Sequence, residues 1–184
     1  MSDTSLDHLS HEAPLRPTPV PLPLPLYWLG KVVDGSVICI GAFMITLVFV
    51  NVVLHAFGKD LAWVTELGEL LMVWVTFLGG ASAAQRGAHM TITEFLDKLD
   101  PAGRRLADMA VQLVCLVVLT FLLYYGWRIV AESWNNTLTT LLWPMAWQYM
   151  PLPLGAGLML VFTAWDFVLT LRGVPRDHRY PADE

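Results

Sequence analysis

ELLMVWVTFLGGASAAQRGAHMTITEFLDKL, from Glu69 to Leu99, is the stretch of sequence that decides the fold. It begins as an apolar run suited to the interior of a lipid bilayer and continues through small residues at 79–84. It then reaches polar and charged residues at 85–89, which are costly inside hydrocarbon and so mark the end of a span. The stretch therefore predicts a membrane-spanning helix with a small-residue patch near its C-terminal end.

A second, shorter helix is predicted directly after this span. Residues 91–94 (TITE) have the spacing of a capping box, which marks a helix N-terminus. The apolar residues that follow share one helical face by their i, i+3, i+4, i+7 spacing: Ile92, Phe95, Leu96 and Leu99. Because so short a helix is marginal in water, we expect residues 92–99 to lie along the cytoplasmic membrane surface or against neighbouring spans.

The composition of the whole chain is that of a membrane protein. Its 184 residues are 55% hydrophobic and only 15% charged, with a mean hydropathy of +0.54, whereas soluble domains carry roughly 25% charged residues. Crossing a hydrocarbon core takes about 20 apolar residues, and the apolar runs of this length predict spans at about 35–57, 61–84, 106–131 and 148–171. The predicted fold is therefore all-α and integral to the membrane, with four transmembrane helices plus the short amphipathic helix.

The basic residues predict how these spans are oriented. Lys59 and Arg128 would be the basic residues on the outer side of the membrane if the N-terminus is cytoplasmic. All the others would then lie inside: Arg16, Lys31, Arg86, Lys98, Arg104, Arg105, Arg172, Arg176 and Arg179. Since cytoplasmic segments carry the excess of Lys and Arg, we expect both termini to be cytoplasmic. The net charge of −5 favours no nucleic-acid partner.

The ends of the chain are expected to be tails outside the membrane domain of residues 27–172. Residues 1–26 carry a Pro-Leu alternation between Pro17 and Pro25, which predicts an extended, disordered cytoplasmic tail. Its first residues are acidic rather than basic, so a signal peptide is not indicated. Residues 173–184 are expected to form a second cytoplasmic tail.

Two carboxylates stand in the first turns of the second span. Glu66 suits the exposed amides and the dipole of a helix N-terminus, which is a structural role. Glu69 lies about two turns in, where an unpaired charge is expensive, so it needs a partner or an aqueous surface. The small residues of this span form the pairs Gly79/Ala83 and Gly80/Ala84, which permit close helix packing. Whether the packing helix belongs to this chain or to another one is left open by the sequence.

Together these residues resemble a known family pattern: Glu69, Trp74, Gly79, Arg86 and a His-hydrophobic pair at His89 and Met90. The pattern is similar to that of the small membrane subunit of tripartite ATP-independent periplasmic (TRAP) transporters, the DctQ-like family. The length and the number of spans fit this family as well. The resemblance implies a subunit of a secondary transporter in the bacterial cell inner membrane.

The resemblance also implies a function and partners. The small subunit would be a scaffold that braces a large membrane subunit, which carries the substrate and cation sites. A periplasmic binding protein would deliver an organic acid to that pair. Glu69, Trp74, Gly79, Gly80, Arg86 and His89 are then expected to be assembly determinants. No catalytic residue, cofactor or metal site is predicted, because the sequence has no phosphate loop, Ser-His-Asp order or HExxH motif.

The sequence leaves two alternatives to the scaffold function. A stand-alone small homo-oligomeric transporter would need a membrane-embedded charge for flux, and Glu69 is the candidate for that role. A haem-binding anchor of a respiratory complex would need two axial ligands on one iron. His55 and His89, however, would lie at opposite membrane faces, roughly 30 Å apart. One haem could not use both histidines.

Overall fold

The computed structural model describes residues 23–59, 61–87 and 101–174, without the side chains of 101, 102, 104 and 105. Four of its helices are long and apolar enough to cross a membrane, which confirms the predicted all-α membrane fold. They are α1 (Leu24–Ala56), α2 (Ala62–Gln85), α4 (Pro101–Glu132) and α6 (Pro151–Leu171). A short 3-10 helix, η2 (Ser133–Asn135), and the single turn α5 (Ala146–Tyr149) lie between α4 and α6.

The first helix is longer than the sequence indicated. We expected a span at 35–57 after a tail of 26 residues, but α1 begins at Leu24. Pro25 is compatible with this start, because the first turn of a helix has no intrahelical partner for its amide groups. With 33 residues, α1 is about 50 Å long, whereas the hydrocarbon core is about 30 Å thick. The amphipathic helix at 92–99 and most of both tails lie outside the described residues.

Glycines in the left-handed conformation end three of the long helices. Gly58 follows α1 with φ +73°, Gly87 follows α2 with φ +68°, and Gly173 follows α6 with φ +76°. In each case a backbone N–H of the final turn bonds back to the helix; that of Gly58, for example, donates to the carbonyl of His55 at 2.9 Å. Glycine adopts this conformation without the steric cost of a Cβ atom, so these positions stop the helices.

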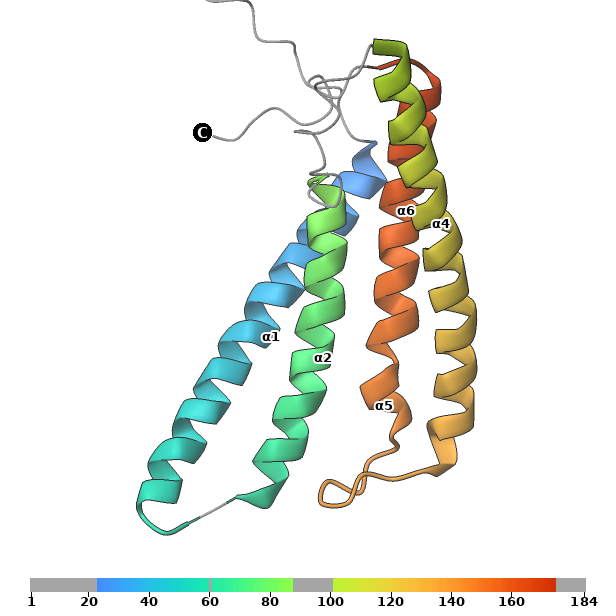
Figure 1. Cartoon of the computed structure of the whole chain (residues 1–184). Coiled ribbons are helices and arrows are strands. Elements are labelled where there is room, and N and C mark those ends of the chain that lie inside the picture. Colours follow the sequence, from blue (N-terminus) through green and yellow to red (C-terminus); the bar gives the residue numbers. More distant parts are fainter. Residues whose placement is uncertain (1–22, 60, 88–100, 175–184) are drawn as a thin grey trace, which may run out of the picture.

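The four long helices form an open row in the order α1, α2, α6, α4 (Figure 1). The main contacts are between neighbours in this row, so α1 and α4 lie at its two edges instead of closing a bundle. The connection from α1 to α2 and the segment from α4 to α6 lie at the same end of the molecule, called here the loop end. In a row, each helix leaves much of its surface uncovered by the described part of the chain.

A small core holds the middle of the row together. Its buried residues are Val33, Leu78 and Ala81, and Trp74 and Met159 pack against them. Close backbone approach supports the pairing of α2 and α6, since a Cβ atom on Gly155 would lie 2.7 Å from that of Phe77. Small residues at such crossings let helices pack tightly in lipid, where hydrophobic association gives no drive.

Candidate functional site

Glu66 anchors the loop at the loop end of the molecule. Its carboxylate accepts hydrogen bonds from the backbone N–H of Thr140, at 2.8 and 2.9 Å to the two oxygens, and of Leu141 at 2.8 Å. The loop is folded back on itself, because Leu138 donates to the carbonyl of Trp143 and Met145 donates to that of Asn136. The sequence indicated a role for Glu66 at the N-terminus of its own helix, and in the structure its carboxylate accepts hydrogen bonds from the loop between α4 and α6.

Glu69, one turn further along α2, has a different environment. Its side chain is exposed, and it makes no hydrogen bond or ion pair with the described residues. By the rise of an α-helix, it lies about 10 Å along α2 from Ala62. This exposed carboxylate in a spanning helix is therefore the least satisfied of the motif residues that the structure describes.

Trp74 makes its contacts inside the chain. The indole Nε1 donates a hydrogen bond of 3.2 Å to the backbone carbonyl of Trp147 in α5, and the ring packs against the core. It thereby ties the middle of α2 to the turn that precedes α6. These contacts give Trp74 a role in the fold of the subunit itself.

The two adjacent glycines of α2 face different surroundings. A Cβ atom on Gly80 would collide with the end of the Met159 side chain on α6, whereas one on Gly79 would meet no atom within 4 Å. Buried residues Ala81 and Ala84 accompany Gly80 toward the interior of the row. The small-residue patch is thus divided: one side packs within this chain and the other is open.

Arg86 pairs with a residue that sequence reasoning did not single out. Its guanidinium donates to the Asp34 carboxylate of α1 at 3.1 Å, and the same carboxylate accepts a hydrogen bond from the Ser82 hydroxyl. Arg86 is still largely exposed, with 65% of its side chain accessible. The sequence feature that could have indicated this pair is Asp34 itself, because an acidic residue next to an apolar run needs a partner.

A polar cluster joins α4 to α6. The Gln112 amide Nε2 donates to the Asp166 carboxylate at 2.7 Å and to the Thr170 hydroxyl at 3.0 Å, and all three residues are buried. Gln112 thereby links α4 to α6 by hydrogen bonds, as single polar residues within membrane spans often do.

The remaining candidates concern metal and haem chemistry. His55 lies in the last turn of α1, while His89 lies outside the described residues, so the geometry of this pair stays untested. Within the described part of the chain, no group of three or more His, Cys, Asp or Glu residues could hold a metal ion.

The side of α2 that no other described helix covers forms a continuous stripe, called here the α2 outer face. Its residues recur at alternating intervals of four and three, which keeps them on one side of a helix. They are Thr65, Glu69, Met72, Thr76, Gly79, Ala83 and Arg86. The motif residues Glu69, Gly79 and Arg86 are brought together on this face, whereas Trp74 and Gly80 point into the row.

Four helices able to span a membrane, a folded loop and a face of α2 that the described residues leave exposed define a small polytopic membrane protein. The chain belongs to the DctQ component family of the tripartite ATP-independent periplasmic transporters, which matches residues 44–173. Members of this family are components of transporters, and the match confirms the family that the sequence motif indicated.

Individual relatives agree with this assignment. The ectoine TRAP transporter small permease protein TeaB of Halomonas elongata is 31% identical over 114 residues. The aligned region covers 59% of this chain and 59% of that protein. The sialic acid TRAP transporter small permease protein SiaQ of Vibrio cholerae is 28% identical over 109 residues, which cover 59% of this chain and 62% of that protein.

Proposed function

We propose that this chain is the scaffold subunit of a TRAP-type secondary transporter. It braces a large membrane subunit during cation-coupled uptake of an organic acid, which a periplasmic binding protein delivers. The observation that carries the proposal is the open row of helices, which leaves an unpaired carboxylate and small residues uncovered on α2. A subunit built to pack against a larger membrane protein needs such a surface, whereas a self-sufficient bundle would cover it.

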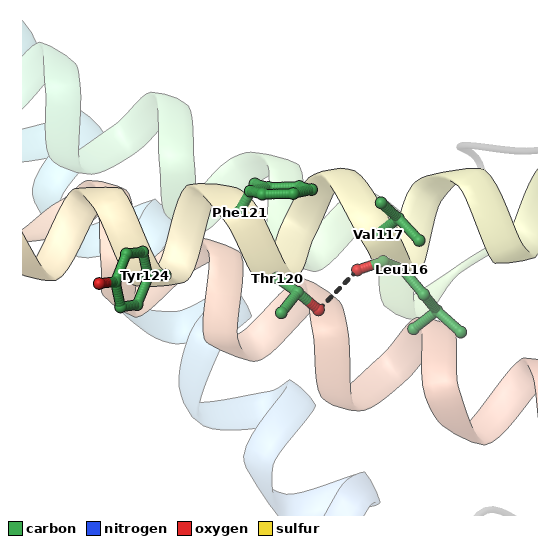
Figure 2. Close-up of a pocket in the computed structure, with 5 residues that line it drawn as sticks. All are labelled: Leu116, Val117, Thr120, Phe121 and Tyr124. Carbon is green, nitrogen blue, oxygen red and sulfur yellow. Dashed lines mark hydrogen bonds between the residues drawn. The ribbon is translucent and has the colours of Figure 1, made fainter.

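The hollows on the surface also favour an accessory role. One shallow groove lies on the outer face of α4 and is lined by Leu116, Val117, Thr120, Phe121 and Tyr124 (Figure 2). A second lies beside α4, where Leu152 of α6 contributes to its lining. The Thr120 hydroxyl already donates to the Leu116 carbonyl at 2.8 Å. Neither groove presents a cation to a carboxylate substrate. They suit hydrocarbon better than an organic anion.

The orientation in the membrane follows from the distribution of basic residues. Lys31, Arg86 and Arg172 gather at the end opposite the loop end, where α1 begins and α2 and α6 stop. Arg128 lies toward the loop end of α4 and pairs with Glu132 at 3.5 Å. By the positive-inside rule, the loop end faces the periplasm and both termini are cytoplasmic, in the bacterial inner membrane.

The relatives do not indicate which solute a transporter containing this chain would carry. Their names specify ectoine and sialic acid, two chemically different solutes, for small subunits that resemble this chain about equally. A scaffold without a substrate site explains why similar small subunits serve different solutes.

Affinity purification of the tagged chain from its native membrane in mild detergent tests the proposal. We expect a stoichiometric, much larger polytopic protein to copurify and to be identified by its mass. Recovery of the chain alone, or only with copies of itself, would overturn the scaffold function and favour the stand-alone transporter. Haem absorbance in the purified sample would point instead to the redox anchor.

A further inference from the structure

The α2 outer face is continuous and long enough to serve as an interface between membrane helices. From Thr65 to Arg86 it extends over about 31 Å of helix, the thickness of the hydrocarbon core. Met72 in its centre is 63% exposed, and the Cβ position of Gly79 has no neighbour within 4 Å. Among the described residues, a bond to this face from another helix is made at its end, where Asp34 of α1 accepts from Arg86.

The Glu69 carboxylate on this face requires a partner or contact with water. An ionised side chain in a lipid-facing position is costly, so such residues pair or face water. Glu69 has no hydrogen-bond or ion-pair partner among the described residues, and Arg86 lies about 25 Å further along the same helix. A helix that packs against α2 at the level of Glu69 would therefore have to present a basic or hydrogen-bond-donating side chain to it.

The outer face of α4 provides an internal comparison. It is exposed as well, but between Asp108 and Arg128 it carries no charged residue, and large apolar side chains such as Phe121 and Tyr124 cover it. Lipid tails solvate such a surface without cost. Small residues and an unpaired charge distinguish the α2 outer face, and these are features of helix–helix contacts within membranes.

A second copy of this chain does not fit the α2 outer face. Two copies inserted in the same orientation would be related by a two-fold axis along the membrane normal, which places each residue near its own counterpart. Glu69 would then face Glu69, and Arg86 would face Arg86. Like charges repel at such distances, so the partner has to be a different chain.

We propose that the α2 outer face docks against a transmembrane helix of the large membrane subunit. That helix presents a Lys, Arg or other hydrogen-bond donor to the Glu69 carboxylate and comes closest to α2 at Gly79 and Ala83. The α4 outer face remains in contact with lipid. This inference rests on the proposed function and adds to it the surface and the chemistry of the partner.

Site-specific photocrosslinking in the coexpressed pair tests the inference. A photoreactive phenylalanine analogue replaces Thr76 on the α2 outer face or Val117 on the α4 groove, and adducts are identified by mass in native membranes. We expect the large subunit to be captured from position 76 and only lipid from position 117. Capture from position 117 alone, or equally from both, would overturn the inference while the wild-type pair still copurifies.

A charge reversal supplies a second readout. We expect Glu69→Lys to lower recovery of the large subunit by about tenfold or more, because the new cation would face the Lys, Arg or other donor of the partner helix. Glu132→Lys, which reverses an exposed charge on α4, is the matched control and should leave recovery unchanged. Equal recovery with both variants would overturn the inference. Failure of the wild-type pair to copurify would instead remove the proposed function and the inference together.

Discussion

Glu66 and Glu69 are one turn apart on α2, yet the Glu66 carboxylate accepts backbone hydrogen bonds from Thr140 and Leu141 while Glu69 bonds to no described residue. Identical side chains on one helix thus have separate roles. Glu66 completes the fold of this subunit, and Glu69 remains available for a partner.

Glu66→Gln should loosen the loop over residues 136–145. The variant replaces one carboxylate oxygen, an acceptor of charge-assisted bonds, by a donor that faces backbone N–H groups. We expect the amides of Thr140 and Leu141 to exchange hydrogen much faster in the variant, measured by mass spectrometry in nanodiscs. Glu132→Gln is the control, since its side chain is exposed and pairs with Arg128 of its own helix. Unchanged protection of both amides would show that the backbone bonds within the loop suffice.

The pair Asp34 and Arg86 should couple α1 to α2 energetically. Because Arg86 is largely exposed, we expect a coupling of only about 0.5–1 kcal/mol between Asp34→Ala and Arg86→Ala. A double-mutant cycle on the free energy of unfolding of the isolated subunit in detergent measures this coupling. Additive effects of the two changes would mean that Arg86 acts elsewhere, for example at the lipid headgroups.

Gln112→Leu should weaken the packing of α4 against α6. The change removes the donor to Asp166 and Thr170, and interhelical hydrogen bonds in membranes contribute about 0.6 kcal/mol on average and up to about 1.7. We expect a loss of free energy of unfolding of about 1 kcal/mol or more, because a buried carboxylate also loses a donor. Thr120→Val, on the lipid-facing side of α4, is the control. A loss no larger than that of the control would contradict the interpretation of this cluster.

Much of this fold is readable from the sequence because lipid imposes simple rules. A run of apolar residues long enough to span the bilayer predicts a helix, and the four spans were found in this way. The order of the helices was not predictable, because apolar faces look alike in sequence whether a helix or lipid covers them. The placement of α6 between α2 and α4 depends on local shape, such as Gly155 against Phe77.

The same limit applies to the site. Glu69 stood out because a charge in a span demands an explanation, and the structure leaves it exposed on α2. The role of Glu66 was missed, because its partners are backbone N–H groups 74 and 75 residues away, which carry no side-chain signal. Gly79 and Gly80 were also indistinguishable in sequence, although the Cβ position of Gly79 is open and that of Gly80 meets Met159 of α6.

Gly79→Leu and Gly80→Leu should therefore differ in what they disrupt. A leucine at position 80 would collide with Met159, and overpacking of this kind costs about 1–3 kcal/mol, so the isolated subunit should lose stability. A leucine at position 79 meets open space, so the isolated subunit should keep its stability but lose close approach to the large subunit. Thermal unfolding of the isolated subunit and copurification of the pair separate these effects. Gly41→Leu on α1, also in open space, is the control for added bulk. If Gly79→Leu assembles as well as Gly41→Leu, the open half of the small-residue patch faces lipid and the partner binds elsewhere.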